Sequence, residues 1–196
     1  MVSLTYSCMQ NYTDGDILLV LRKLQEKQVG RKNLSEFLAL GEATVRTLFR
    51  KLESRQFIES TQKGQKITEK GEHYLTTLPY FSLPQEVTVK DITLSTHSIA
   101  SLVHNFSTHV KNGMQFRDAA IIAGASGATT LIFKNGGFVF PYGNTKLTSK
   151  IQNYLIERFS PSEGDVLIIA TADTEQKAMR GLSGSLSLLI QQDKNL

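Results

Sequence analysis

The chain has 196 residues, of which 40% are hydrophobic and 20% are charged, with 14 glycines and only 4 prolines. This composition is close to the average of soluble globular proteins, and it excludes a collagenous, low-complexity or wholly disordered chain. The length suits one large domain or two small ones. The formal net charge is +4, and within residues 31–70 nine basic residues stand against five acidic ones. That local excess favours a polyanionic partner.

Nothing in the sequence indicates a membrane or an oxidising compartment. The longest apolar runs, at residues 17–21 and 166–170, are far shorter than the roughly 20 residues that a membrane helix needs. The first ten residues have neither the basic start nor the apolar stretch of a signal peptide. The single cysteine, Cys8, has no partner in the chain for a disulfide. We therefore expect a cytoplasmic protein.

The first predicted elements are helices. Residues 14–28 carry apolar side chains at the spacing of a one-sided helix, which residue 13 or 14 can cap. A short second helix is predicted over residues 35–40, with Ser35 as its cap, before Gly41 breaks the chain. A third helix begins at Glu42. Its apolar stripe must face the core and consists of Val45, Leu48, Phe49 and Leu52. Its opposite face carries Arg46, Thr47, Arg50, Lys51 and Ser54.

After Arg55 the period of the apolar residues changes from 3.6 to 2. Residues 57–61 and 66–68 flank a turn at 62–65, which predicts a small hairpin. Thr68 then caps a fourth helix through about residue 78. The stretch 77–85 holds two of the four prolines, so we divide the chain there, into an amino-terminal domain over residues 1–83 and a second domain over residues 84–196.

These elements resemble the winged helix-turn-helix of archaeal transcriptional regulators over about residues 13–78. The residues that carry the likeness are the run 41–48, then Leu52, Gly64 and the run 68–71. The resemblance implies that residues 44–55 form the recognition helix and residues 62–66 the tip of the wing.

Together with this resemblance, the side chains predict binding to double-stranded DNA. The major groove admits one helix, whose short polar and guanidinium side chains read base edges. A Lys-Gly hairpin can approach a phosphate backbone closely. The alternative is a solvated helix face, the commonest role of a run of charges. The predicted DNA-binding residues are Thr44, Arg46, Thr47, Arg50, Lys51, Lys63, Gln65 and Lys66.

The second part of the chain is predicted to alternate strands and helices. Strands are expected over residues 86–94, 98–105, 128–134, 137–140 and 165–172, and helices over residues 115–123, 147–159 and 174–191. The segment 98–105 also fits a helix, and we favour a strand. Asn135-Gly136 is typical of a tight hairpin turn. The predicted fold class is α+β, in which the winged helix-turn-helix joins a second α/β domain with a helix-backed mixed sheet of the ferredoxin-like split β-α-β type.

The segments 117–120, 123–125, 127–131 and 164–166 resemble an uncharacterised archaeal domain that follows a winged helix in candidate transcriptional regulators. The likeness covers roughly residues 87–190. It supports a regulator with two domains and implies no chemistry.

Several sites in this part have alternative interpretations. The glycine-rich run 124–127 follows a helix and precedes a strand, which favours a helix stop over a phosphate loop. His97, His104 and His109 match no zinc-binding spacing, so we predict no metal and no cofactor. A candidate effector site comprises Arg117, Asp118 and Asp173, although surface ion pairs and helix capping also explain these residues.

The sequence therefore predicts a sequence-specific DNA-binding transcriptional regulator, not an enzyme. Its carboxy-terminal domain would dimerise, sense a small-molecule effector, or both. A homodimer is expected because operators are commonly two-fold. One alternative is an enzyme of small-molecule metabolism with a regulatory winged helix, and another is a protein-interaction adaptor of the transcription machinery.

Overall fold

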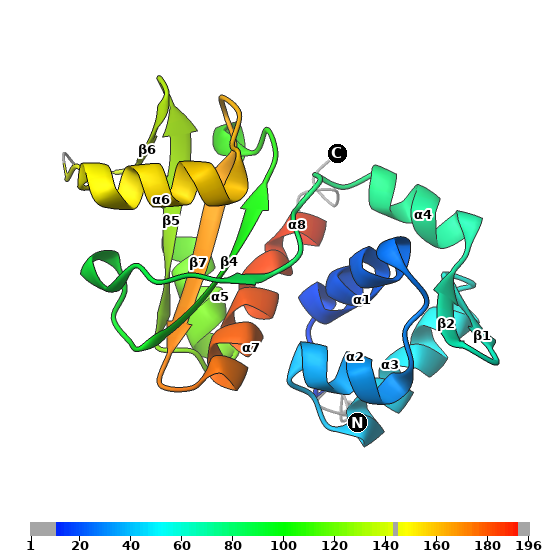
Figure 1. Ribbon diagram of the computed structural model, residues 1–196. Helices are drawn as coiled ribbons and strands as arrows, with labels where there is room; N and C mark the ends of the chain where they lie inside the picture. The colour runs from blue at the N-terminus through cyan, green and yellow to red at the C-terminus, as the bar shows by residue number, and fades with distance from the viewer. Residues whose placement is uncertain (1–10, 143–144, 192–196) are drawn as a thin grey trace, which may run out of the picture.

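The computed structural model describes residues 11–142 and 145–191, which form two packed halves (Figure 1). The first half contains α1 (Asp14–Glu26), α2 (Arg31–Leu38), α3 (Glu42–Ser54), β1 (Ile58–Thr61), β2 (Gly64–Ile67) and α4 (Glu69–Thr76). The second half contains β3 (Gln85–Glu86), the 3-10 turn η1 (Lys90–Ile92), β4 (His97–Val103), the 3-10 turn η2 (Ser107–His109), α5 (Met114–Ile122), β5 (Gly127–Lys134), β6 (Gly137–Val139), α6 (Ser149–Phe159), β7 (Val166–Ala172), α7 (Glu175–Leu186) and α8 (Leu188–Gln191).

The first half has the predicted order of helices and hairpin. Thr13 caps α1 in a reciprocal capping box with Asp16, and Thr68 caps α4. The predicted apolar stripe of α3 is buried, with at most 4% of any of its side chains exposed, and consists of Val45, Leu48, Phe49 and Leu52. The face of α3 that turns away from the core is therefore the predicted one. Helices with a β-hairpin in this order are compatible with a winged helix.

The second helix was predicted to begin too late. It starts at Arg31 after Gly30, and Ser35 lies inside it, where its hydroxyl donates to the carbonyl of Leu40 instead of capping the first turn. The polar run that opens α2 has no apolar residue before Leu34, so its first turn gives no periodic signal. Leu34 and Leu38, one turn apart, are both fully buried and fix the helix to the core.

The second half is built on a five-stranded sheet with the order β3-β4-β7-β5-β6. All four pairs of neighbouring strands are antiparallel, so the predicted mixed sheet is wrong. Strand β7 pairs with both β4 and β5, which therefore run in the same direction on either side of it. A split β-α-β connection through α5 is thus present, but the order of elements along the chain could not reveal that the last strand fills the gap.

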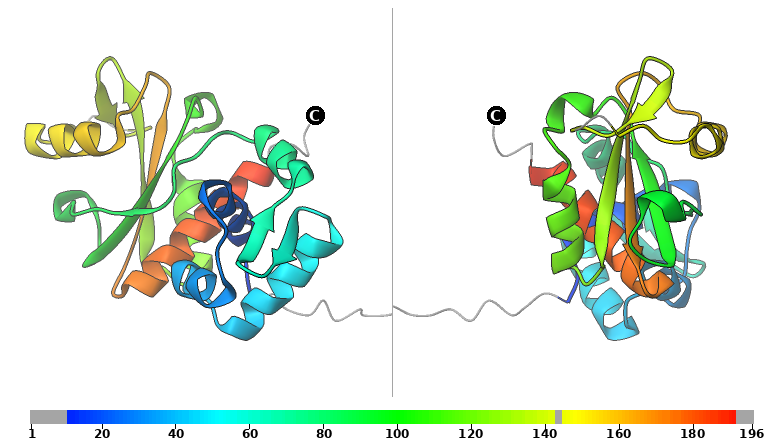
Figure 2. Two further views of the ribbon diagram at one scale, coloured as in Figure 1. Left: turned by 45° about the vertical axis from the view of Figure 1, so that its right-hand side comes forward. Right: turned by 90° about the vertical axis from the view of Figure 1, so that its left-hand side faces the viewer.

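The sheet is backed by helices, as predicted, and they cover both of its faces. Helices α5 and α7 pack on one face, and α6 packs on the other (Figure 2). All seven residues of β7 are buried between these layers. A central strand covered on both faces reads as a continuous apolar run, as residues 166–170 do.

Two further predictions need correction in the second half. The strand expected over 86–94 is reduced to β3, in which Gln85 and Glu86 pair with β4. The backbone N–H of Val87 adds one more hydrogen bond, to the carbonyl of Ser98 on β4, and both Val87 and Val89 are buried. The last helix was expected over 174–191, but it breaks at Ser187 between α7 and α8. The hydroxyl of Ser187 donates to the carbonyl of Ser183 and accepts the backbone N–H of Gly15 on α1.

The two halves share a core. Helix α7 packs against α1, and one cluster of buried apolar residues runs from the first half to the face of the sheet that α7 covers. The single cysteine, Cys8, lies outside the described residues. Among the helices that the structure describes, none has the length and apolar character to span a bilayer.

Candidate nucleic-acid interface

Helix α3 follows α2 after a turn at residues 39–41, in which Ala39 adopts the left-handed conformation that ends α2. Opposite its buried stripe, the side chains of Arg46, Thr47 and Arg50 are exposed. The hydroxyl of Thr47 donates to the carbonyl of Ala43 at 3.2 Å, while neither arginine forms a hydrogen bond or an ion pair within the part of the chain that the structure describes. Both guanidinium groups are thus available to an external acceptor.

Two of the predicted residues of α3 are less open. Thr44 is half-buried near the start of the helix. Lys51 is also half-buried, and its ammonium nitrogen lies 5.3 Å from the ring centroid of Tyr12. Burial raises the pKa of the Tyr12 phenol, and the charge of Asp14 raises it further. The neutral ring therefore supports the carboxy-terminal half of α3, and Lys51 lies partly against it.

The hairpin β1–β2 has the place predicted for the wing, with a two-residue turn at Gln62-Lys63. The predicted turn at 62–65 was too long, because Gly64 and Gln65 already belong to β2. Gly64 has a φ of +120°, and a Cβ there would lie 2.7 Å from the backbone of Val29. Val29 exchanges backbone hydrogen bonds with Gln65, so the wing is anchored to the chain between α1 and α2.

The predicted wing residues differ in their surroundings. Lys63 is exposed at the turn, and its side chain has no partner within the described residues. Lys66 lies 3.7 Å from the carboxylate of Glu59 on the neighbouring strand. The side chain of Gln65 is half-buried and donates to the hydroxyl of Ser60 at 2.8 Å. Of these three residues, Lys63 is the best placed to contact a phosphate, and Gln65 the least.

The predicted effector residues belong to two separate ion pairs. Arg117 and Asp118 form an exposed ion pair with each other on α5, at 3.0 Å. Arg117 lines a hollow of about 210 Å³ beside Met114 and Tyr142, and Asp173 is not among its lining residues. Asp173 instead pairs with Lys177 at 2.8 Å, and the hydrogen bond from Lys177 lowers the pKa of the Asp173 carboxyl.

Another cavity, of about 280 Å³, lies between the two halves. Its lining residues include Glu36 and Phe37 of α2 and Glu175 and Met179 of α7, but none of the predicted effector residues.

The other sequence motifs have structural surroundings of their own. Gly124 has a φ of +100° and ends α5 before β5 begins, which agrees with a helix stop. His104 lies 3.1 Å from the carboxylate of buried Asp165. The three histidines belong to no group of metal-ligating side chains within residues 11–142 and 145–191.

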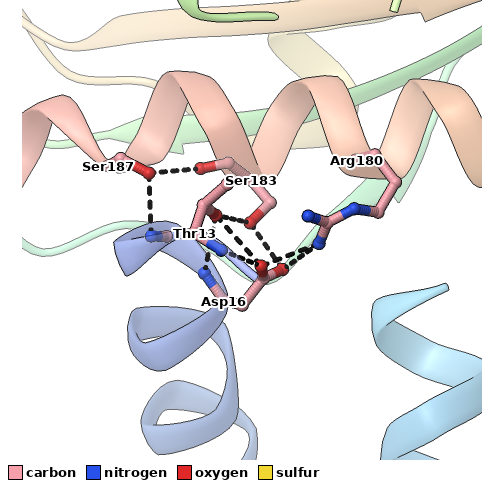
Figure 3. A network of polar contacts seen from close by, with 6 residues as sticks. Thr13, Asp16, Arg180, Ser183 and Ser187 are labelled. Carbon is pink, nitrogen blue, oxygen red and sulfur yellow. Dashed lines mark hydrogen bonds and ion pairs between the residues drawn. The ribbon is translucent and has the colours of Figure 1, made fainter. Parts of the chain in front are cut away.

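A polar cluster at the junction between the halves was missed by the sequence analysis (Figure 3). The fully buried carboxylate of Asp16 accepts hydrogen bonds from Arg180 at 2.7 Å, from Ser183 at 2.6 Å and from the backbone N–H of Thr13 at 2.6 Å. The spacing of Thr13 and Asp16 is that of a capping box and was visible in the sequence. The partners on α7 lie more than 160 residues away along the chain, and no local pattern links them to α1.

Comparisons with known proteins give two family matches and a similar solved structure. A family model described as the PH0730-like N-terminal domain matches residues 13–73, and one described as a domain of unknown function (DUF4443) matches residues 94–189. The solved structure of the hypothetical protein PH0730 from Pyrococcus horikoshii OT3 is 32% identical, covers 93% of this chain and 95% of that chain, and gives a TM-score of 0.72. No curated protein matches the chain.

Proposed function

The chain belongs to the PH0730-like family, and we propose that it is a transcriptional regulator that binds double-stranded DNA through α3 and the wing. One observation carries the proposal. The outward face of α3 exposes Arg46, Thr47 and Arg50, and both guanidinium groups lack a described partner, while the opposite face is buried in the core. A helix fixed to a core in this way presents its polar face as a rigid unit.

The dimensions of duplex DNA suit this arrangement. The major groove is about 12 Å wide and admits one α-helix. Arg46 and Arg50 are one turn apart on α3, so both side chains can reach base edges from a helix lying in the groove. Arginine donates two hydrogen bonds to the O6 and N7 atoms of guanine, the commonest specific contact with DNA. These two residues are therefore the proposed readers of sequence.

The wing has a different role in the proposal. The ammonium group of Lys63 stands at the turn between the strands, next to the side-chain-free backbone of Gly64. Such a tip can approach a phosphate closely, and phosphate contacts set affinity and register without reading bases. Lys63 is thus the proposed phosphate contact.

The direct test is binding of the purified full-length chain to fragmented genomic DNA in the presence of competitor DNA, followed by sequencing of the retained fragments. Enrichment of a defined motif is expected. Uniform weak retention would argue against sequence-specific regulation and favour the adaptor or the enzyme with a regulatory winged helix.

Substitutions on α3 test the proposed readers. Arg46→Ala and Arg50→Ala are each expected to weaken binding to the enriched motif by about 1–3 kcal/mol, because each removes a bidentate contact with a base. The matched control is Arg158→Ala, which removes an exposed arginine from α6 in the other half of the chain. If the α3 variants bind as the control does, the DNA surface lies elsewhere.

A further inference from the structure

We propose that the exposed face of α5 is the contact between two copies of this chain, with the two α5 helices packed antiparallel about a two-fold axis. The inference goes beyond the proposed function and does not depend on DNA binding. It assigns Arg117 and Asp118 a role in association instead of effector binding.

One face of α5 is already used within the chain. Phe116 and Ala120 are fully buried. Gly181 and Gly184 of α7 leave no room for a side chain here. If either carried a Cβ, that atom would lie within 2.7 Å of an alanine of α5 or of the loop after it. The two helices are therefore in close contact along this face, and α5 has no freedom to turn its other face inward.

The other face of α5 exposes apolar side chains. Met114 is 49% exposed, Ile121 48% and Ile122 87%. Two further exposed apolar residues, Leu94 and Tyr142, lie close by. Leu94 and Arg117 both lie within 3.8 Å of the position that a Cβ would take at Gly127. Tyr142 lines the same hollow as Met114 and Arg117. We call these residues together with Arg117 and Asp118 the α5 surface. A contiguous apolar surface with a charged centre is typical of a protein contact.

The order of residues along α5 identifies the partner as a second copy. Positions 114, 117, 118 and 121 share one stripe of the helix, with the charged pair at the centre and an apolar residue on either side. A two-fold axis that crosses the helix between Arg117 and Asp118 sets Arg117 opposite Asp118 of the second copy. The same axis sets Met114 opposite Ile121 of the second copy. The stripe is therefore complementary to itself in both charge and polarity, which a two-fold interface requires.

Within one chain the charged pair is free to change partners. The Arg117–Asp118 ion pair is exposed, with 47% and 55% of the two side chains accessible, and it joins adjacent residues. Exposed pairs of this kind contribute little to stability. In the dimer, Arg117 would pair with Asp118 of the second copy instead of Asp118 of its own chain. Both charges would stay paired, and they would be removed from water and surrounded by apolar side chains. Ion pairs in such a contact confer specificity.

The sheet provides a second observation on the same side of the molecule. Strand β6 pairs only with residues Ile132–Lys134 of β5, so the preceding residues of β5 have an edge that pairs with no described strand. Helix α5 packs on β5, so this edge and the helix belong to the same part of the molecule. An unpaired strand edge is itself a place where another chain can add. The surface available to a second copy therefore extends beyond the helix, as an interface of standard size requires.

The proposed contact leaves the candidate DNA-binding surface free. Helix α7 lies between α5 and the winged-helix half, which it contacts through α1 (Figure 1). In the right-hand view of Figure 2, α5 and the outer strands face the viewer, with the winged-helix half behind them. Two copies joined through α5 would each keep α3 uncovered.

The test is a charge-exchange cycle on the full-length chain, read by sedimentation equilibrium. Arg117→Asp sets two carboxylates opposite each other across the axis, and Asp118→Arg sets two guanidinium groups opposite each other. Each single change is expected to weaken the dimer about 10-fold or more. The double variant Arg117→Asp/Asp118→Arg restores opposite charges and is expected to recover most of the lost affinity. Ile121→Lys, which leaves the charged pair intact, should also weaken the dimer.

The matched control exchanges the charges of Asp173 and Lys177, an exposed ion pair at the start of α7, and should leave the association constant unchanged. Thermal unfolding monitored by circular dichroism checks that every variant is folded, as expected for exposed positions. A wild-type chain that is monomeric at roughly 100 μM would overturn the proposal. A dimer insensitive to the single changes, or a double variant as weak as both single ones, would overturn it equally. Because association is measured without DNA, its failure is distinct from a failure to bind DNA.

Discussion

At the scale of single residues, the Asp16 carboxylate is a charged group in the core that requires partners. It is fully buried, and the Arg180 side chain that neutralises it is only 18% exposed. Burial of a charge is costly unless the charge is paired and its remaining lone pairs accept hydrogen bonds. Ser183 and the backbone N–H of Thr13 supply those bonds. The cluster therefore joins the cap of α1 to the middle of α7 and depends on all its members.

We predict that Asp16→Ala destabilises the chain by about 3 kcal/mol, because it leaves the Arg180 guanidinium without its partner and removes half of the capping box. Urea or thermal unfolding measures the loss. The control is Asp14→Ala, which removes an exposed carboxylate from the same turn of α1 and should cost no more than about 0.5 kcal/mol. Equal stability of both variants would mean that the buried pair contributes nothing net.

At the scale of elements, the sequence predicted what local patterns determine. The stripe of Val45, Leu48, Phe49 and Leu52 fixed the orientation of α3, and Asn135-Gly136 fixed the hairpin of β5 and β6, where both residues have positive φ. The start of α2 and the order of strands were not predictable in this way. The first turn of α2 has no apolar residue, and the place of β7 between β4 and β5 depends on pairing across long stretches of chain.

The same limit applies to the candidate site. Exposure of Arg46 and Arg50 follows from the period of α3, so these residues could be predicted. The engagement of Gln65 with Ser60 and of Lys66 with Glu59 depends on the register of the hairpin. That register places the two residues of each pair directly opposite each other on neighbouring strands, and the turn that sets it was predicted two residues too long.

For the wing, the prediction concerns the dependence of DNA binding on salt. Lys63→Ala is expected to weaken binding similarly on all sequences and to reduce the slope of log K against log salt by about 0.9, the value for one lost phosphate contact. The measurement is a titration at several salt concentrations. Lys134→Ala, which removes a lysine next to the other hairpin turn, is the control and should leave the slope as in the wild type. An unchanged slope for Lys63→Ala would place the wing away from the backbone of the DNA.

At the scale of the whole molecule, the division into residues 1–83 and 84–196 describes the chain but not its core. Buried residues of α1, α3 and β1 belong to one cluster with those of α7 and with one face of β4 and β7. Among the described residues, the opposite face of the sheet, under α6, has a separate cluster. The first half therefore relies on α7 for part of its burial, and α7 relies on α1 in the same way.

This shared core predicts that the two halves unfold as one unit. Leu155→Ala removes a fully buried side chain from α6, on the far side of the sheet, and Leu48→Ala removes one from α3. Each is expected to cost about 2–5 kcal/mol. Native-state hydrogen exchange should then show that each variant lowers the protection of the slowest amides in both α3 and β7 by the same free energy, because those amides exchange only through global unfolding.

The control is Thr47→Ala at an exposed position of α3, which should leave the protection of both sets of amides unchanged. If Leu155→Ala lowers protection in β7 while α3 keeps its own, the winged helix opens independently, and the contact between α1 and α7 is a docking surface instead of a common core.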